Sequence, residues 1–162
     1  MPTTTEKTNE TKIAPIPAGH SALAPYLQVR GAEKAMDFYA KAFGARELFH
    51  LKGQDGRVMH AEMRIGDAIL MLSDVPPAGP GSPQPPAPGA ARLNSILFYT
   101  EDVDGTFAKA SAAGATVLMP PTDMFWGDRF GKLLDPFGHE WGVATHKEDV
   151  SPEEMQRRMA CA

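Results

Sequence analysis

The residues of this chain best suited to chemistry are histidines and glutamates that stand close together. His60 and Glu62 are separated by one residue, and alternate residues of a β-strand point to the same face. A His-x-Glu pair can ligate a divalent cation, and His139, Glu140 and His146 offer further donors. Alternatively, His60 and Glu62 line a polar sheet face and hydrogen-bond across strands. The sequence alone leaves both interpretations open.

A second group of candidates stands in the run Phe125-Trp126-Gly127-Asp128-Arg129. Its position before an expected strand predicts a place at the rim of a sheet. Trp126 can cover a cavity there, because a large amphipathic ring suits a wet edge. Arg129 can hold a carboxylate or a phosphate, whose geometry its guanidinium fork matches. Alternatively, Asp128 and Arg129 pin the loop itself.

The elements that must position these residues occur twice along the chain. Residues 26–74 and 95–145 each show the pattern of a strand, a helix and three strands, and each helix ends in Gly-Ala, at Gly44-Ala45 and Gly114-Ala115. Glycine is a common stop after the last helical turn. Such repetition predicts that neither unit buries its sheet alone. The expected segments are 22–29, 32–43, 46–51, 57–65 and 68–72, then 95–100, 102–113, 116–119, 129–134 and 139–145.

The remaining chain divides around these two units. We expect a disordered tail at 1–19, a first module at 20–74, a proline-rich linker at 75–92, a second module at 93–147 and a C-terminal helix at 148–162. The proline density of the linker favours a semi-extended connector. Pro120-Pro121 is expected to end the strand before it, and Ser151-Pro152-Glu153-Glu154 predicts a capping box at the start of the last helix.

Composition excludes several classes of partner. The chain has 162 residues, 43% of them hydrophobic and 22% charged, which is typical of a globular protein. A net charge of −4 argues against a nucleic-acid partner. No apolar run approaches the ~20 residues of a membrane span, and we expect the polar N-terminal segment not to act as a signal peptide. The single cysteine, Cys161, excludes an intramolecular disulfide and favours a cytoplasmic location.

Several segments carry a combined family pattern. They are Val29 to Tyr39 with Phe43-Gly44-Ala45, Met59-His60-Ala61-Glu62-Met63 with Ile65-Gly66-Asp67, Trp126-Gly127-Asp128-Arg129-Phe130-Gly131, Asp135-Pro136-Phe137-Gly138-His139-Glu140-Trp141, and Ala144-Thr145-His146. Together they resemble the vicinal oxygen chelate superfamily, which includes glyoxalase I, extradiol dioxygenases, and the fosfomycin- and bleomycin-resistance proteins. The match is closest to its PhnB-like branch.

This resemblance implies an α+β fold. Two tandem βαβββ modules would form a curved eight-stranded mixed sheet cup, the glyoxalase-like fold, with a short C-terminal helix added. Members are commonly homodimers that hold a small organic molecule in the cup. The resemblance therefore implies a small-molecule ligand and a second copy of the chain as partners.

The resemblance also locates a metal site, which this chain does not fill with suitable donors. In metal-dependent members the ligands come from the first and last strands of each module, which here correspond to Ala24, Met71, Ser95 (or Asn94) and Gly142. Alanine and glycine have no donor atom, and a thioether is too soft for a hard cation. We expect no metal at these positions and no other cofactor, with His60 and Glu62 left as alternative ligands.

Strand alternation then predicts the lining of the cavity. The expected ligand-binding residues are Tyr26, Gln28, Met71, Ser95, Tyr99, Trp126, Arg129 and Glu140. Trp141 alternates with the cavity-facing positions, so it is expected to pack beneath a helix.

Three functions are compatible with this lining. The first is a metal-independent protein that binds a small organic molecule. The second is a lyase, isomerase or dioxygenase-type enzyme, either metal-dependent through His60 and Glu62 or metal-free with Glu140 or Tyr99 as the acid–base group. The third is a partner-binding protein that uses its last helix, residues 151–159.

Overall fold

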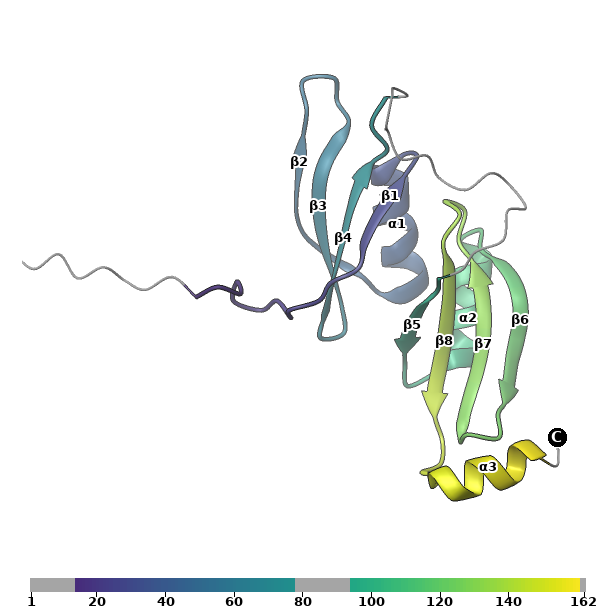
Figure 1. Ribbon diagram of the computed structural model, residues 1–162. Coiled ribbons are helices and arrows are strands. Elements are labelled where there is room, and N and C mark those ends of the chain that lie inside the picture. The colour runs from purple at the N-terminus through teal and green to yellow at the C-terminus, as the bar shows by residue number, and fades with distance from the viewer. Residues whose placement is uncertain (1–13, 78–93, 161–162) are drawn as a thin grey trace, which may run out of the picture.

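The computed structural model describes residues 14–77 and 94–160. Most of the expected tail, most of the linker and Cys161 lie outside the described residues. The described chain forms two βαβββ modules followed by a C-terminal helix, as shown in Figure 1. The predicted fold class is confirmed.

The first module is a four-stranded sheet covered by one helix. Its strands lie in the order β1-β4-β3-β2, with β1 parallel to β4 and the other pairs antiparallel. Gly44 ends α1 with a φ of 67°, the left-handed conformation that glycine adopts at low cost. Asp74 accepts hydrogen bonds from the amides of Gly31 and Ala32, both at 2.9 Å, so the last strand caps the helix. The elements are β1 (Tyr26–Val29), α1 (Ala32–Phe43), β2 (Arg46–Lys52), β3 (Val58–Ile65) and β4 (Ala68–Asp74).

The second module repeats this arrangement, with its strands in the order β5-β8-β7-β6. As expected, Asp102 caps the helix, and its Oδ1 accepts a hydrogen bond from Gly105 N at 2.9 Å. The elements are β5 (Ile96–Tyr99), α2 (Val103–Ala112), β6 (Thr116–Asp123), β7 (Asp128–Leu134) and β8 (Glu140–His146).

One predicted boundary in this module is wrong. Pro120 and Pro121 do not end β6, which continues to Asp123. The strand lies at the edge of its sheet, where a missing amide donor is tolerated. Its pairing with β7 is irregular between Met119 and Thr122, which accommodates the two prolines.

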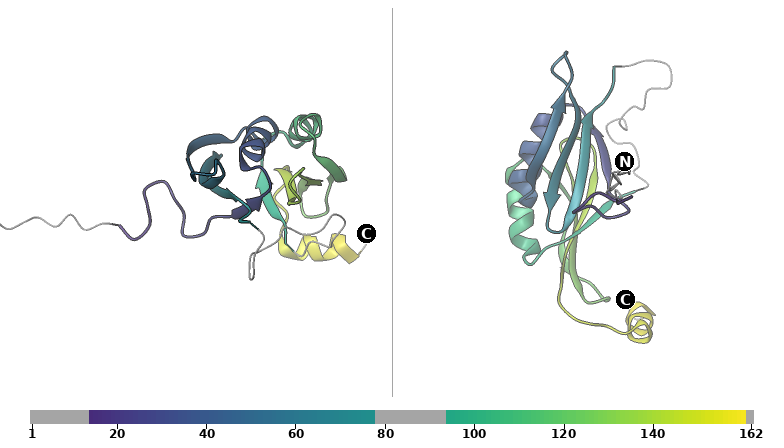
Figure 2. Two further views of the ribbon diagram at one scale, coloured as in Figure 1. Left: turned by 90° about the horizontal axis from the view of Figure 1, so that it is seen from above. Right: turned by 90° about the vertical axis from the view of Figure 1, so that its left-hand side faces the viewer.

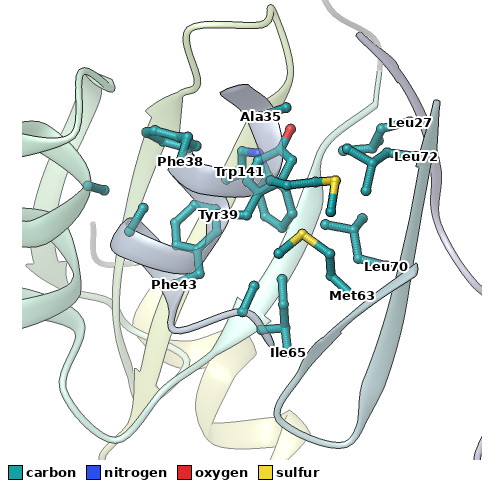
Figure 3. Packing of buried hydrophobic residues seen from close by; sticks show 14 of the residues in the cluster. Leu27, Ala35, Phe38, Tyr39, Phe43, Met63, Ile65, Leu70, Leu72 and Trp141 are labelled. Atoms are coloured by element: carbon teal, nitrogen blue, oxygen red, sulfur yellow. The ribbon is translucent and has the colours of Figure 1, made fainter. Parts of the chain in front are cut away.

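Both long helices cover the same side of the two sheets and lie next to each other, which leaves the other side of the sheets open (Figure 2). We call this second side the open face. The shared core lies under the helices, where Trp141 contacts Phe43 at a ring-centroid distance of 4.7 Å and Tyr39 at 5.5 Å (Figure 3). Trp141 is 1% exposed, so the prediction that it packs beneath a helix is confirmed. The modules therefore share one hydrophobic core.

The C-terminal helix α3 (Pro152–Ala160) lies outside this core, and none of its described residues is buried. Only half of the predicted capping box forms. Ser151 Oγ accepts a hydrogen bond from Glu154 N at 3.3 Å, whereas the Glu154 carboxylate pairs with Arg157 and Arg158. Within residues 14–77 and 94–160, no helix has the length and apolar character needed to cross a membrane.

Candidate functional site

One row of side chains crosses the open face of the first sheet. Tyr26 stands opposite Met71, Met71 opposite Glu62, and Glu62 opposite Phe49. Their neighbours along the strands, such as Met63, are buried against α1. Alternation therefore turns the row away from the helices, and the structure places Tyr26 and Met71 on the face that strand alternation predicts.

A chain of hydrogen bonds runs across this row. Tyr26 Oη lies 3.2 Å from His60 Nδ1, His60 Nε2 lies 3.3 Å from Glu62 Oε1, and Glu62 Oε2 lies 3.0 Å from His20 Nε2. We call these four residues the Glu62 relay. Glu62 is only 8% exposed, so a burial cost is offset by two imidazole partners.

His20 belongs to the segment before β1, which is held over the sheet. Arg64 Nη2 donates to Gly19 O at 3.4 Å, next to the His20–Glu62 contact. Both ring nitrogens of His20 face acceptors, Ala18 O at 3.3 Å and the Glu62 carboxylate. No periodic signal in the sequence marks His20, because it precedes the first regular element.

The second sheet carries a different cluster on its open face, centred on Asp128. Tyr99 Oη donates to Asp128 Oδ2 at 2.9 Å, Trp126 Nε1 donates to the same oxygen at 3.1 Å, and His146 Nδ1 lies 2.7 Å from Oδ1. Burial opposes ionisation of Asp128, but these three hydrogen bonds outweigh it and lower the pKa of the carboxyl. The hydrogen bonds to Asp128, and then to Asp149, raise the pKa of His146. Trp126 and Tyr99 are thereby fixed at one end of the sheet.

Arg129 points to the other side of the sheet from Asp128. Its Nε and Nη2 lie 2.7 and 2.8 Å from the Asp104 carboxylate at the start of α2, and its Nη1 lies 3.2 Å from Asp123. Hydrogen bonding to Asp104 and then Asp123 raises the pKa of the guanidinium. The side chain thus ties the rim of the sheet to the helix layer, as in the loop-pinning alternative, and does not face the open side.

A cavity of about 350 Å³ lies at the seam between the modules, where β1 approaches β5 and β8. It brings together three residues predicted from the sequence, Tyr26, Ser95 and Glu140. Glu140 Oε1 lies 3.0 Å from Lys132 Nζ, so the wall is neutralised there. Across the seam, His139 Nε2 lies 3.2 Å from the main-chain oxygen of Gln28.

A neighbouring groove of about 280 Å³ is mainly apolar. Its walls include Ile69 from the first module and Leu97 and Tyr99 from the second. The groove and the seam cavity share Pro25 and Ile96. They therefore adjoin at the seam, and we call the two together the recess; Tyr26 lines the first and Tyr99 the second.

The residues at the metal-ligand positions that the family resemblance implies, which we call the inherited positions, do not suit a hard cation. Met71 and Gly142 stand on the open faces of the two sheets, at the expected positions, and neither offers an oxygen or nitrogen side-chain donor. A Cβ at position 142 would lie 2.9 Å from Phe130 Cε2, so the ring occupies the space that a ligand side chain would need.

His60 and Glu62, the alternative metal ligands, are arranged for hydrogen bonding and not for holding a cation. His60 and His20 contact different oxygens of Glu62 and do not converge on one point. In the described part of the chain, no group of three or more histidine, cysteine, aspartate or glutamate side chains is placed to hold a metal ion.

Two βαβββ modules with helices on one side and a recess between open sheets define a glyoxalase-type fold. The chain belongs to the Glyoxalase/Bleomycin resistance protein/Dioxygenase superfamily, whose family model matches residues 19–143. The protein Mb0911c of Mycobacterium bovis is 42% identical over 141 residues, which cover 86% of this chain and 92% of that protein.

Solved structures extend the comparison. The PhnB protein from Bacillus cereus aligns with a TM-score of 0.58 at 20% identity, over 77% of this chain and 99% of that chain. The fosfomycin resistance protein FosX from Listeria monocytogenes, solved with Mn(II) and sulfate, aligns with a TM-score of 0.59 at 15% identity, over 84% of this chain and 97% of that chain. At these identities, the likeness shows the shared fold alone.

Proposed function

We propose that this protein binds a small organic molecule in the recess between its modules and over the open face of its first sheet. The observation that carries the proposal is the position of Tyr26, which lines the seam cavity and also joins the Glu62 relay. A cavity of about 350 Å³ lies within the range of small-molecule sites. Apolar walls and a few convergent polar groups are also typical of such sites.

The ligand class follows from the lining. Lys132 pairs with Glu140 in the seam cavity, and on the open face two imidazoles contact Glu62, so both carboxylates already have partners. Aromatic rings and the Met71 thioether offer a flat apolar surface. We infer a neutral or amphipathic planar ligand, bound without a metal at the inherited positions.

A metal-dependent enzyme that uses His60 and Glu62 is the second candidate. It is supported by the histidine–carboxylate cluster itself, which contains ligands suited to several divalent ions. The arrangement around separate oxygens of Glu62 favours the hydrogen-bonded interpretation instead. Metal analysis of the purified full-length protein distinguishes the two. A stoichiometric divalent ion that is lost in His60→Ala would refute the metal-free site.

We also propose that the protein is a homodimer. Phe49 is 42% exposed and Leu97 is 54% exposed, although both belong to sheets of a protein with an extensive core. Exposed apolar side chains on a sheet face are typical of surfaces that another chain covers. A second copy would cover them and deepen the recess.

The binding function is tested by calorimetric titration with planar aromatic fragments selected by a thermal-shift screen. We expect Tyr26→Ala to weaken binding by about tenfold or more, because one aromatic contact and one hydroxyl are lost. His50→Ala, a substitution in β2 outside the relay, serves as the matched control and should bind as the wild type does. Equal affinity of the Tyr26→Ala variant and the wild type would contradict the site.

A further inference from the structure

The Glu62 relay contains one imidazole with a distinctive set of partners. His60 Nε2 faces a carboxylate oxygen at 3.3 Å, and its Nδ1 faces the Tyr26 hydroxyl at 3.2 Å. A carboxylate accepts hydrogen bonds, so the proton of His60 belongs on Nε2. The lone pair of Nδ1 then points toward Tyr26 Oη, which donates to it.

Two other histidines of the described chain have different partners. His146 has both nitrogens against carboxylates, Asp128 at 2.7 Å and Asp149 at 3.0 Å, so both must donate. His50 pairs through Nδ1 with a glutamate of its own strand at 2.7 Å, at a position that faces away from the row. His60 differs from both, because it combines an orienting carboxylate with a lone pair directed at a hydroxyl.

We propose that His60 is the general base of a metal-independent proton-transfer site, with Glu62 as its positioning residue and Tyr26 as a hydrogen-bond donor. A carboxylate that holds the Nε2 proton fixes the tautomer and the ring orientation. The second oxygen of Glu62 lies 3.0 Å from His20 Nε2, so both carboxylate oxygens have a hydrogen-bond partner. This inference rests on the proposed binding function, because it requires a ligand over the same face.

Access to His60 is open from the sheet face. Its side chain is 27% exposed, whereas the Glu62 side chain is 10% exposed, so the base is reachable and its orienting group is covered. The rings of Tyr26 and Phe49 each pack beside the imidazole at a centroid distance of 5.7 Å, so aromatic surface borders His60 on the open face. The substrate class is therefore a planar carbon acid with an oxygen that gains negative charge.

The step is balanced without a further reactant. The C–H proton moves to His60 Nδ1, and the C–H electron pair enters the π system of the substrate. Negative charge develops on a substrate oxygen, to which the Tyr26 hydroxyl, released from Nδ1, donates a hydrogen bond. His60 then returns its proton to the product or to water.

The probe for this step is 5-nitrobenzisoxazole, a flat carbon acid. Removal of its ring C–H proton turns the C–H electron pair into part of a nitrile, the N–O bond breaks, and the leaving electrons reside on a coloured phenolate. Steady-state absorbance gives kcat and KM for the full-length protein. Free imidazole at the same pH supplies the reference rate.

We expect His60→Gln to lower kcat by about 100-fold or more while KM changes little, because general-base catalysis contributes factors of this size. Glu62→Gln should lower kcat by about tenfold or more, as loss of an orienting partner does. His50→Gln, which removes a histidine paired with Glu47, is the matched control and should keep full activity. Nitrogen-15 NMR provides a separate readout, since Glu62→Gln should shift the His60 proton away from Nε2.

The outcomes separate the two proposals. The general-base assignment is overturned if turnover is no faster than with free imidazole, or if His60→Gln and the wild type turn over equally fast. If the probe nevertheless binds, the binding function still stands. If the probe and the aromatic fragments all fail to bind, both proposals are contradicted. Comparing the melting temperatures of His60→Gln and the wild type shows whether a loss of activity comes from unfolding. Tyr26→Phe is a milder second variant, and it should also reduce kcat.

Discussion

The Tyr39 hydroxyl donates a 2.8 Å hydrogen bond to Asp135 Oδ2, which joins helix α1 of the first module to the β7–β8 turn of the second. The same oxygen accepts a hydrogen bond from Trp141 Nε1 at 3.0 Å. Burial, followed by the charge and hydrogen bond of Asp135, raises the pKa of Tyr39. The contact lies in the core that aligns the two sheets, so the recess between them depends on it.

Tyr39→Phe should therefore destabilise the whole protein. We expect a loss of about 1.5–3 kcal/mol in the free energy of unfolding, the range for a hydrogen bond to a charged group. Chemical denaturation measures it, with Tyr26→Phe on the exposed face as a control that should lose much less. A loss equal to that of the control would show that the Asp135 contact is not a stabilising link.

Gly142 and Phe130 should be energetically coupled. Gly142→Ala brings a Cβ to within contact of the Phe130 ring and should cost about 1–3 kcal/mol through overpacking. In Phe130→Ala, the same change should cost much less, because the ring is gone. A double-mutant cycle measures the coupling. Additive losses would contradict the account of why this position cannot carry a metal ligand.

The His146–Asp128 pair should make stability depend on pH. The pKa of His146 is raised from 6.5, so its contribution is fully present below that unfolded value and is lost as pH rises through the folded pKa. The pKa of Asp128 is lowered from 3.8, so its contribution is present above that value and is lost as pH falls through the folded pKa.

The pair therefore stabilises most between these two values. His146→Gln should lower the melting temperature more at about pH 5.5 than at about pH 9. Asp149→Asn removes only the exposed partner of His146 and should give a smaller difference with the same sign. A deficit of the His146→Gln variant that is the same at both pH values would count against the ion pair.

A dimer should respond to charge on the open face. Leu97→Glu introduces a carboxylate where an apolar side chain is 54% exposed, so it should shift sedimentation toward a monomer without lowering the melting temperature of the monomer. Met159→Glu, on the exposed helix α3, is the control and should leave the mass unchanged. A wild-type protein that sediments as a monomer at all concentrations would refute the dimer.

Much of the fold follows from local sequence signals. The structure shows the repeated modules, the end of α1 at Gly44 and the Asp102 cap of α2 as the sequence predicts. These features can be predicted because a helix end depends on a few residues close together in the chain. Strand alternation also separates Trp141 from Gly142, and the two residues lie on opposite faces of the sheet as expected. Period-two patterns suffice for such assignments because a strand has only two faces.

The polar contacts of the site depend on tertiary structure instead. His20 reaches Glu62 from a segment without regular structure, and no spacing in the sequence connects them. Asp128 and Arg129 are adjacent but point to opposite faces of the sheet. The Arg129 guanidinium therefore pairs with Asp104 on the helix side, and the Asp128 carboxylate lies on the open face with His146. Such polar contacts join residues that are distant in the sequence, so they form only when the chain folds and brings their separate elements together.

The most direct test of the account is NMR of the full-length protein with labelled methionine methyl groups. Met71 lies on the open face beside Tyr26, whereas Met36 of α1 and Met63 of β3 are buried in the core between the helices and the sheets. A planar aromatic fragment that binds should shift the Met71 methyl signal strongly and leave those of Met36 and Met63 nearly unchanged. Binding that leaves Met71 unshifted would contradict a ligand site on the open face of the first sheet.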